Sequence, residues 1–322
     1  MTERIYLKFN YPGATPGSKT LLTGIRSHGE TLYITGFYED FETISFLYRG
    51  DVSGNINSPC SHNSYNILDY PSAPGRTVES TNLYGPDILK SGVRVVGNYT
   101  TVEAGTSTIG CMYEGPLNGE GKWITLTPSD DTLNTIAHST MGNLVVGNYD
   151  TLLVQGKAFI YDVKKQTYHE IVKPYAVSIT AYGIWHNQGH CYTICGSYTD
   201  INQIGVGYLV DWNNKTHEFS NWRDYNYPKS VITHFDGITS DECGGYNLTG
   251  DSFLITGEQI GFFAQVHRHK NCKFSHSKWS EIKYPGSTAT SGNSVDKETV
   301  IGVYTDASDL AGAVNGYISV VI

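Results

Sequence analysis

Two polar residues in the last third of the chain, His234 and Asp236, have types and a spacing that suit acid–base chemistry. They lie two residues apart in the run His-Phe-Asp-Gly-Ile, and residues two apart on a β-strand point to the same side. An imidazole and a carboxylate in one pocket can form an acid–base or an orienting pair. We therefore interpret His234 and Asp236 as candidate catalytic residues, if the fold brings their strand to a pocket.

Similar strands recur in the sequence, and the residue at the Asp236 position is polar in all six copies: Thr23, Tyr84, Thr135, Tyr182, Asp236 and Ser291. Two residues earlier the set is Leu21, Asn82, Leu133, Thr180, His234 and Ala289. Strand alternation places both sets on one face, as two rings around a channel. The phenols of Tyr84 and Tyr182 could stabilise a developing oxyanion, so both join the candidate catalytic residues. The candidate substrate-binding residues are Thr23, Thr135, Thr180, Asn82 and Ser291, with Tyr175 in a turn entering one of these strands and Phe41 in a loop. The alternative is a water-filled channel whose polar residues are merely hydrated.

Prolines mark the repeat that positions these strands. Six of the eleven prolines share one register, 46 to 59 residues apart: Pro12, Pro71, Pro128, Pro174, Pro228 and Pro285. A small-residue turn, a Gly-x-Tyr strand and a short apolar run follow each proline, with Gly250 and Ser252 as the degenerate fifth copy. Four strand-length runs bounded by turn residues predict four antiparallel strands per repeat. We therefore expect an all-β chain, with residues 1–322 forming a single six-bladed β-propeller domain.

The two ends of the chain complete each other. The last copy stops after its third strand, whereas residues 5–11 match the outermost strand of the other copies. We expect this N-terminal strand to pair beside residues 315–321, because that pairing closes the ring and covers otherwise exposed strand edges.

The repeat resembles that of the HAF-type repeat proteins, which combine a Pro-Gly-Ala turn, a Gly-Ile-Asn-x-x-Gly-x-Ile-Val-Gly-x-Tyr-x-Asp segment and a Gly-Phe-Leu-Tyr strand. The segments YPGAT, YPGST, GIRSHGETLYITGFYED, VIGVYTD and SFLY carry this resemblance, which covers nearly the whole chain. It implies a propeller scaffold and no single activity.

Composition excludes several classes of function. The net charge is −9 and no run of Lys or Arg occurs, so nucleic acid is not an expected partner. No stretch approaches 18 apolar residues, so no membrane span is expected. Residues 1–10 lack a signal-peptide core, which indicates a cytoplasmic protein or one whose leader has been removed.

Signatures of cofactor or metal use are also missing. The sequence has no GxSxG elbow, phosphate-binding loop, dinucleotide fingerprint or HExxH motif, so we expect no cofactor. His267, His269, Cys272 and His276 cluster, but their spacing matches no zinc pattern, and an exposed turn without metal is the favoured interpretation. A disulfide between Cys243 and Cys272 is plausible in an oxidising compartment.

Three functions remain. The first is a cofactor-independent enzyme that binds a small, largely apolar organic substrate at the channel mouth, such as a cyclase of secondary metabolism. Shape and a few hydrogen-bond donors suffice for such a reaction. The second is a lectin-like, carbohydrate-binding propeller, favoured by the Tyr, Trp and Asn content. The third is a protein-interaction scaffold that uses its rims.

Overall fold

All regular structure in the described residues is β-strand. The structure is a computed structural model that describes residues 3–52, 64–105, 107–269, 271–310 and 312–321. Within these ranges there is no helix, and so none that could cross a membrane.

The strands form four four-stranded sheets and one eight-stranded sheet. The first sheet contains β2 (Lys19–His28), β3 (Thr31–Glu39), β4 (Thr43–Gly50) and β5 (Ser64–Ile67). The second contains β6 (Val78–Leu89), β7 (Gly92–Thr101), β8 (Ile109–Gly115) and β9 (Lys122–Leu126). The third contains β10 (Thr132–Met141), β11 (Leu144–Thr151), β12 (Lys157–Asp162) and β13 (Thr167–Ile171).

The eight-stranded sheet consists of two antiparallel runs. One run is β14 (Ala176–Gln188), β15 (Cys191–Asp200), β16 (Gly205–Asn213) and β17 (Glu218–Tyr225). The other is β18 (Ser230–Ser240), β19 (Gly245–Leu254), β20 (Gln259–His267) and β21 (Lys278–Ile282). The single parallel pair Gly205↔Ile232 joins them, through β16 and β18.

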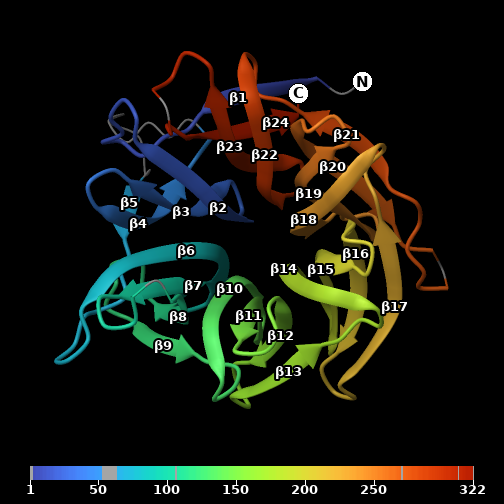
Figure 1. The fold of residues 1–322 in the computed structure, drawn as a ribbon, viewed down its shortest axis with the longest axis horizontal. Coiled ribbons are helices and arrows are strands. Elements are labelled where there is room, and N and C mark those ends of the chain that lie inside the picture. The colour runs from blue at the N-terminus through green and yellow to red at the C-terminus, as the bar shows by residue number, and fades with distance from the viewer. Residues whose placement is uncertain (1–2, 53–63, 106, 270, 311, 322) are drawn as a thin grey trace.

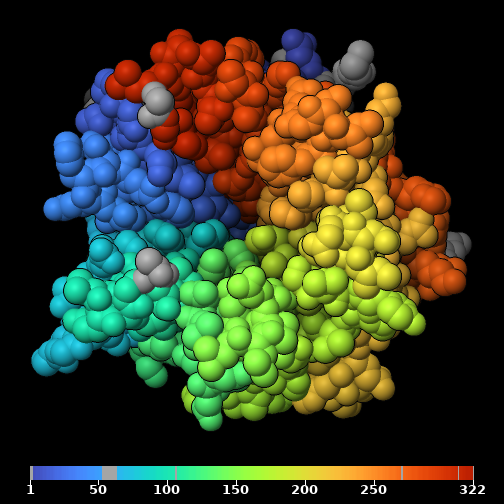
Figure 2. All heavy atoms as spheres, in the orientation of Figure 1, coloured from blue at the N-terminus to red at the C-terminus, as the bar shows by residue number. Residues whose placement is uncertain are grey.

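The last sheet joins the two ends of the chain. It contains β22 (Ser287–Asp296), β23 (Thr299–Asp306), β24 (Asn315–Val321) and β1 (Arg4–Lys8). β1 pairs antiparallel with β24, from Arg4↔Val321 to Lys8↔Tyr317. The predicted pairing of the N-terminal strand is therefore confirmed, although the strand is shorter than the expected residues 5–11. Figure 2 shows the first and last parts of the chain side by side.

The innermost strands enclose the centre of a β-propeller. β2, β6, β10, β14, β18 and β22 each contact the next, and β22 contacts β2. Figure 1 shows these strands nearest the centre, with the later strands of each sheet farther out.

Stacked aromatic rings explain two of the sequence anchors. The tyrosine before the proline stacks on the tyrosine of the Gly-x-Tyr strand, with ring centroids 3.9 Å apart for Tyr70 and Tyr99 and 3.6 Å for Tyr284 and Tyr304. The backbone N–H of Tyr70 also donates to Thr81 Oγ1 at 2.9 Å. Because each such tyrosine lies in the connection between two sheets, these contacts fix how one sheet follows the next.

Candidate functional site

Six side chains from the six innermost strands line a central cavity of about 310 Å³. A cavity of this volume is at the lower end of the range for small-molecule sites. The lining residues are Thr23, Tyr84, His138, Tyr182, Asp236 and Asn293.

A β-bulge presents each of these residues. Each innermost strand pairs with the strand that follows it in the chain, and this pairing skips the residue that lines the cavity. In β6 it skips two residues, because the register jumps from Leu83 to Pro86. In β18, for example, Phe235 pairs with Gly250 and Gly237 with Thr249, so that Asp236 has no partner. A bulge twists a strand and re-aims its side chain. In β2 the glycine after the bulge permits close packing, because a Cβ on Gly24 would lie 2.6 Å from the Cα of Gly85 in the neighbouring strand.

The cavity has an aromatic half and a polar half. Consecutive strands β6, β10 and β14 supply three rings in contact, with centroids 5.2 Å apart for Tyr84 and His138 and 4.5 Å apart for His138 and Tyr182. The other three strands supply Asp236, Asn293 and Thr23.

Two of the three polar residues are engaged by the protein itself. Thr23 Oγ1 donates to the Leu83 carbonyl at 2.6 Å, and Asn293 Nδ2 donates to the Leu22 carbonyl at 2.7 Å. The Asn293 side-chain oxygen accepts from the Ser291 hydroxyl. Both residues therefore fasten neighbouring innermost strands to each other as well as lining the cavity.

Asp236 is different, because no hydrogen bond to its carboxyl group is found within the described residues. Burial, together with the nearby Asp251, raises the pKa of Asp236 well above its usual range. A buried carboxyl without a compensating cation is more stable in its neutral form. In this neutral form, Asp236 offers both a hydroxyl donor and a carbonyl acceptor to the cavity.

The rings of the aromatic half are also held uncharged. Burial lowers the pKa of His138 to about 4, although the Nε2 of His138 lies 2.5 Å from Asn148 Oδ1, and this contact works in the opposite direction. Burial raises the pKa of Tyr84 to about 12 and also raises that of Tyr182. The pKa shifts of the titratable side chains that line the cavity thus all favour their neutral forms.

His234 lies one alternation step from the cavity, nearer the start of β18. Its Nδ1 is 3.7 Å from Asp251 Oδ1, and its ring centroid is 6.0 Å from that of Tyr182. Burial lowers the pKa of His234, and Asp251 opposes this effect. Asp251 also accepts a 2.6 Å bond from Gln259, so the imidazole has a fixed acceptor beside it.

The structure corrects two of the predicted positions. Thr135 is buried on the opposite side of β10, where its methyl group packs beside Gly110, and His138 occupies the cavity position. Ser291 lies two residues before the bulge of β22, as His234 does in β18, and Asn293 lines the cavity in place of Ser291. In β10 the predicted residue, Thr135, lies three positions before the bulge residue, His138. Because successive side chains of a strand alternate between its two faces, an offset of three places Thr135 on the opposite face. The pairing Ala137↔Gly147 is the signal that would have placed His138, since Gly147 belongs to a Gly-x-Tyr anchor.

The remaining candidates lie outside the cavity. Asn82 and Thr180 are on the same face as the lining residues but one step away, as predicted for the second ring. Tyr175, in the β13–β14 connection, has 85% of its surface exposed, and Phe41, in the β3–β4 connection, is fully exposed. Both belong to a rim of the ring.

Arg26 obstructs one end of the channel. It is 7% exposed, and its guanidinium donates to the Ile184 carbonyl of β14, on a strand that does not adjoin β2, at 3.4 Å. Burial lowers the pKa of Arg26, and Asp296 and Asp87 oppose this effect. Because Arg26 follows Thr23 along β2, the cavity is open toward the end where the innermost strands begin.

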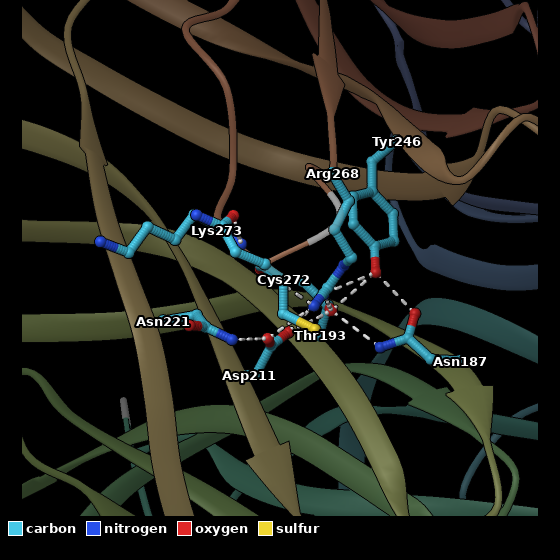
Figure 3. Close-up of polar contacts among 9 residues, drawn as sticks. Asn187, Thr193, Asp211, Asn221, Tyr246, Arg268, Cys272 and Lys273 are labelled. Carbon is cyan, nitrogen blue, oxygen red and sulfur yellow. Dashed lines mark hydrogen bonds and ion pairs between the residues drawn. The ribbon is translucent and has the colours of Figure 1, made fainter.

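A second cleft, of about 480 Å³, lies between the two runs of the eight-stranded sheet. Arg268 donates to both carboxylate oxygens of Asp211 in this cleft, at 2.6 and 2.8 Å. Figure 3 shows these two side chains and the polar residues around them. Arg268 also donates to Thr193 and Tyr246, and Asn221 donates to Asp211. Because these groups satisfy one another, the network acts as a clamp between the two runs.

Cys243 and Cys272, for which a disulfide was considered plausible in an oxidising compartment, are both free and exposed in this structure. Of the clustered histidines, His267 Nδ1 lies 3.6 Å from Asp241, and His276 accepts from Arg223 at 3.0 Å. The described part of the chain contains no group of three or more metal-ligating side chains.

No family model and no curated protein sequence matches the chain. Among solved structures it is similar to an alpha-L-arabinofuranosidase from Podospora anserina in complex with cellotriose, with 10% identity, a TM-score of 0.46, and coverage of 97% of this chain and 93% of that one. A thermostable family-43 glycoside hydrolase gives 10% identity, a TM-score of 0.45, and coverage of 96% and 91%. A mannose phosphorylase from Leishmania mexicana in complex with phosphate gives 12% identity, a TM-score of 0.44, and coverage of 86% and 90%. At such identities and TM-scores these likenesses carry no inference about substrate or reaction, and none of the three is described as a cyclase.

Proposed function

We propose that the protein binds a small carbohydrate, one sugar ring in size, in the central cavity. The observation that carries this proposal is the division of one cavity into a wall of three touching rings and an unengaged carboxyl group opposite. A sugar has an apolar face of C–H groups that packs on aromatic rings, and hydroxyl groups that need donors and acceptors.

The neutrality of the cavity supports an uncharged ligand. Protonated Asp236 can donate to a sugar oxygen and accept from a sugar hydroxyl, which a carboxylate cannot do in both directions. His234, fixed beside Asp251, supplies a further polar contact to a substituent that extends toward the mouth.

Isothermal titration calorimetry with a panel of methyl glycosides tests the proposal, with indole and naphthol as purely aromatic probes. We expect a glycoside to bind, and Tyr182→Ala to weaken its binding by at least about tenfold through loss of the stacking ring. Tyr175→Ala is the matched control, because it removes an exposed tyrosine outside the cavity and should leave affinity unchanged. Binding of the aromatic probes alone, or equal losses in both variants, would contradict a sugar site in the cavity.

A second candidate is a cofactor-independent enzyme, and the raised pKa of Asp236 favours it. A carboxyl that keeps its proton near neutral pH is suited to general acid catalysis. Release of nitrophenol from nitrophenyl glycosides that bind distinguishes the two candidates. A catalyst should lose turnover in Asp236→Asn while still binding, whereas a lectin should show no turnover in the native protein.

The architecture that we propose for this function is a single six-bladed domain over residues 1–322, of the HAF-type repeat kind. The single parallel pair between β16 and β18 supports counting the eight-stranded sheet as two blades. The six innermost strands in cyclic contact support the same count.

A further inference from the structure

The two faces of the ring carry different connections. The innermost strands begin, and the second strands end, on one face, which we call the entry face. It holds the connections β3–β4, β7–β8, β11–β12, β15–β16, β19–β20 and β23–β24, together with those that lead into each innermost strand. Because Arg26 obstructs the opposite end of the channel, the entry face is also the face on which the cavity opens.

Exposed apolar side chains are concentrated on the entry face. Of the sixteen large apolar residues that the described chain exposes, only Ile5 and Ile67 lie within outer strands. The other fourteen are in the connections of the entry face or in the first two residues of an innermost strand: Phe41, Val102, Leu133, Leu152, Leu153, Val154, Val172, Tyr175, Val177, Ile201, Ile204, Val231, Ile255 and Leu310. Among described residues, the connections of the other face expose none.

These side chains do not serve the packing of the chain itself. Phe41 is 100% exposed and Leu153 is 90% exposed, so their apolar surface contributes almost nothing to folding. Every one of the six connections between second and third strands carries at least one such residue. Apolar surface gathered on one side of a soluble protein marks an interaction site.

The charge of the same connections selects the partner. The six connections between second and third strands contain no Lys, Arg or His, whereas they contain Asp40, Glu42, Glu103, Glu258 and Asp309. Glu258 is paired with Lys283, at 3.3 Å. In the connections that lead into the innermost strands, Lys173 is paired with Asp224 at 3.0 Å, whereas Arg76 and Lys229 have no ion pair among the described residues. The same connections also contain Asp69, Asp130 and Asp131, so acidic residues outnumber basic ones on this face.

We propose that the entry face docks a polypeptide segment of a partner protein that combines apolar and basic side chains. The acidic residues disfavour an anionic membrane, since like charges repel there, and they disfavour face-to-face association of two copies for the same reason. The apolar side chains of such a segment would cover the exposed apolar residues. Its basic side chains would pair with carboxylates that have no ion pair among the described residues, such as Asp40, Glu42 and Glu103. This docking goes beyond the sugar site and does not depend on it.

Fluorescence anisotropy with a labelled 14-residue peptide of alternating leucine and lysine tests this proposal, with the leucine–glutamate peptide for comparison. We expect the lysine peptide to bind, with an affinity that falls as salt is added. The triple variant Phe41→Ser, Leu153→Ser, Ile255→Ser should weaken binding by about tenfold or more, because it removes three exposed contacts from three sheets. Ile67→Ser, an exposed residue on the outer strand β5, is the matched control and should change affinity less than about twofold.

Equal binding of the two peptides, or unchanged peptide binding in the triple variant, would overturn the proposal. So would a protein that binds neither peptide but whose vesicle binding or self-association changes in the triple variant. Vesicles of phosphatidylcholine with and without phosphatidylglycerol, and sedimentation velocity, provide the last two measurements. Tyr182→Ala should leave peptide binding intact, which keeps this test separate from that of the sugar site.

Discussion

Lowering the pH from 7 to 4 should destabilise the fold through His138. Burial lowers the pKa of this imidazole from 6.5 to about 4. The unfolded chain therefore takes up a proton at this residue near pH 6.5, but the folded chain does so only near pH 4. The stabilising contribution is complete above pH 6.5 and is lost as the pH falls toward 4.

The size of this loss follows from the two pKa values. Their separation corresponds to a ceiling of about 3.4 kcal/mol in the free energy of unfolding. Water that enters the cavity screens part of the cost of charging the ring, so we expect about 2 kcal/mol.

Urea denaturation at pH 7, 6, 5 and 4 isolates this term when the native protein is compared with His138→Gln, whose amide can still donate to Asn148. The stability difference between the two proteins should change by about 2 kcal/mol from pH 7 to pH 4. His190→Gln, at an exposed histidine, should show no such change. A His138 imidazole that titrates near 6.5 by NMR, or a stability difference independent of pH, would refute the reasoning.

Two other outcomes are expected. Deleting residues 1–8 removes β1 and exposes the edge of β24. The melting temperature should therefore fall by at least about 10 °C, and aggregation should increase. An unchanged melting temperature would mean that β1 is dispensable. The raised pKa of Asp236 in the folded state makes the native protein lose stability as the pH rises above about 4. Asp236→Asn removes this carboxyl group, so the variant should gain stability relative to the native protein toward neutral pH. Denaturation curves of the two proteins with identical pH dependence would contradict this expectation.

The sequence repeat predicted the ring well because its anchors have structural causes. The tyrosine–proline anchor recurs because its ring stacks on the Gly-x-Tyr ring, as Tyr70 does on Tyr99. The alternation of side chains then placed Thr23, Tyr84, Tyr182 and Asp236 on the channel face, where the structure has them.

His138 and Asn293 were missed because bulge positions are set by pairing between strands. In the sixth copy of the repeat, Ser291 aligns with Asp236 because a glycine follows each of them. In the structure, however, the bulge of β22 lies one residue after Gly292, at Asn293. No local pattern records that shift. Phe41 was placed in a loop from the sequence, but the gathering of exposed apolar residues on one face was not predicted, because the face on which a connection lies is known only once the strands are placed in space.

The pairing of β1 with β24 has a consequence for the order of folding during synthesis. β1 leaves the ribosome before the other described strands, and its partner β24 leaves after them. Apart from the single bridge between β16 and β18, the intervening sheets pair strands that are consecutive in the chain and can form as they emerge, whereas β1 lacks its partner until β24 has been translated. Joining segments so far apart in the chain carries a loop-closure entropy cost, so the final sheet should be the slowest step. Until that step the edge of β1 that pairs with β24 stays open, so β1 is the strand of this ring that is exposed longest to pairing with a wrong partner.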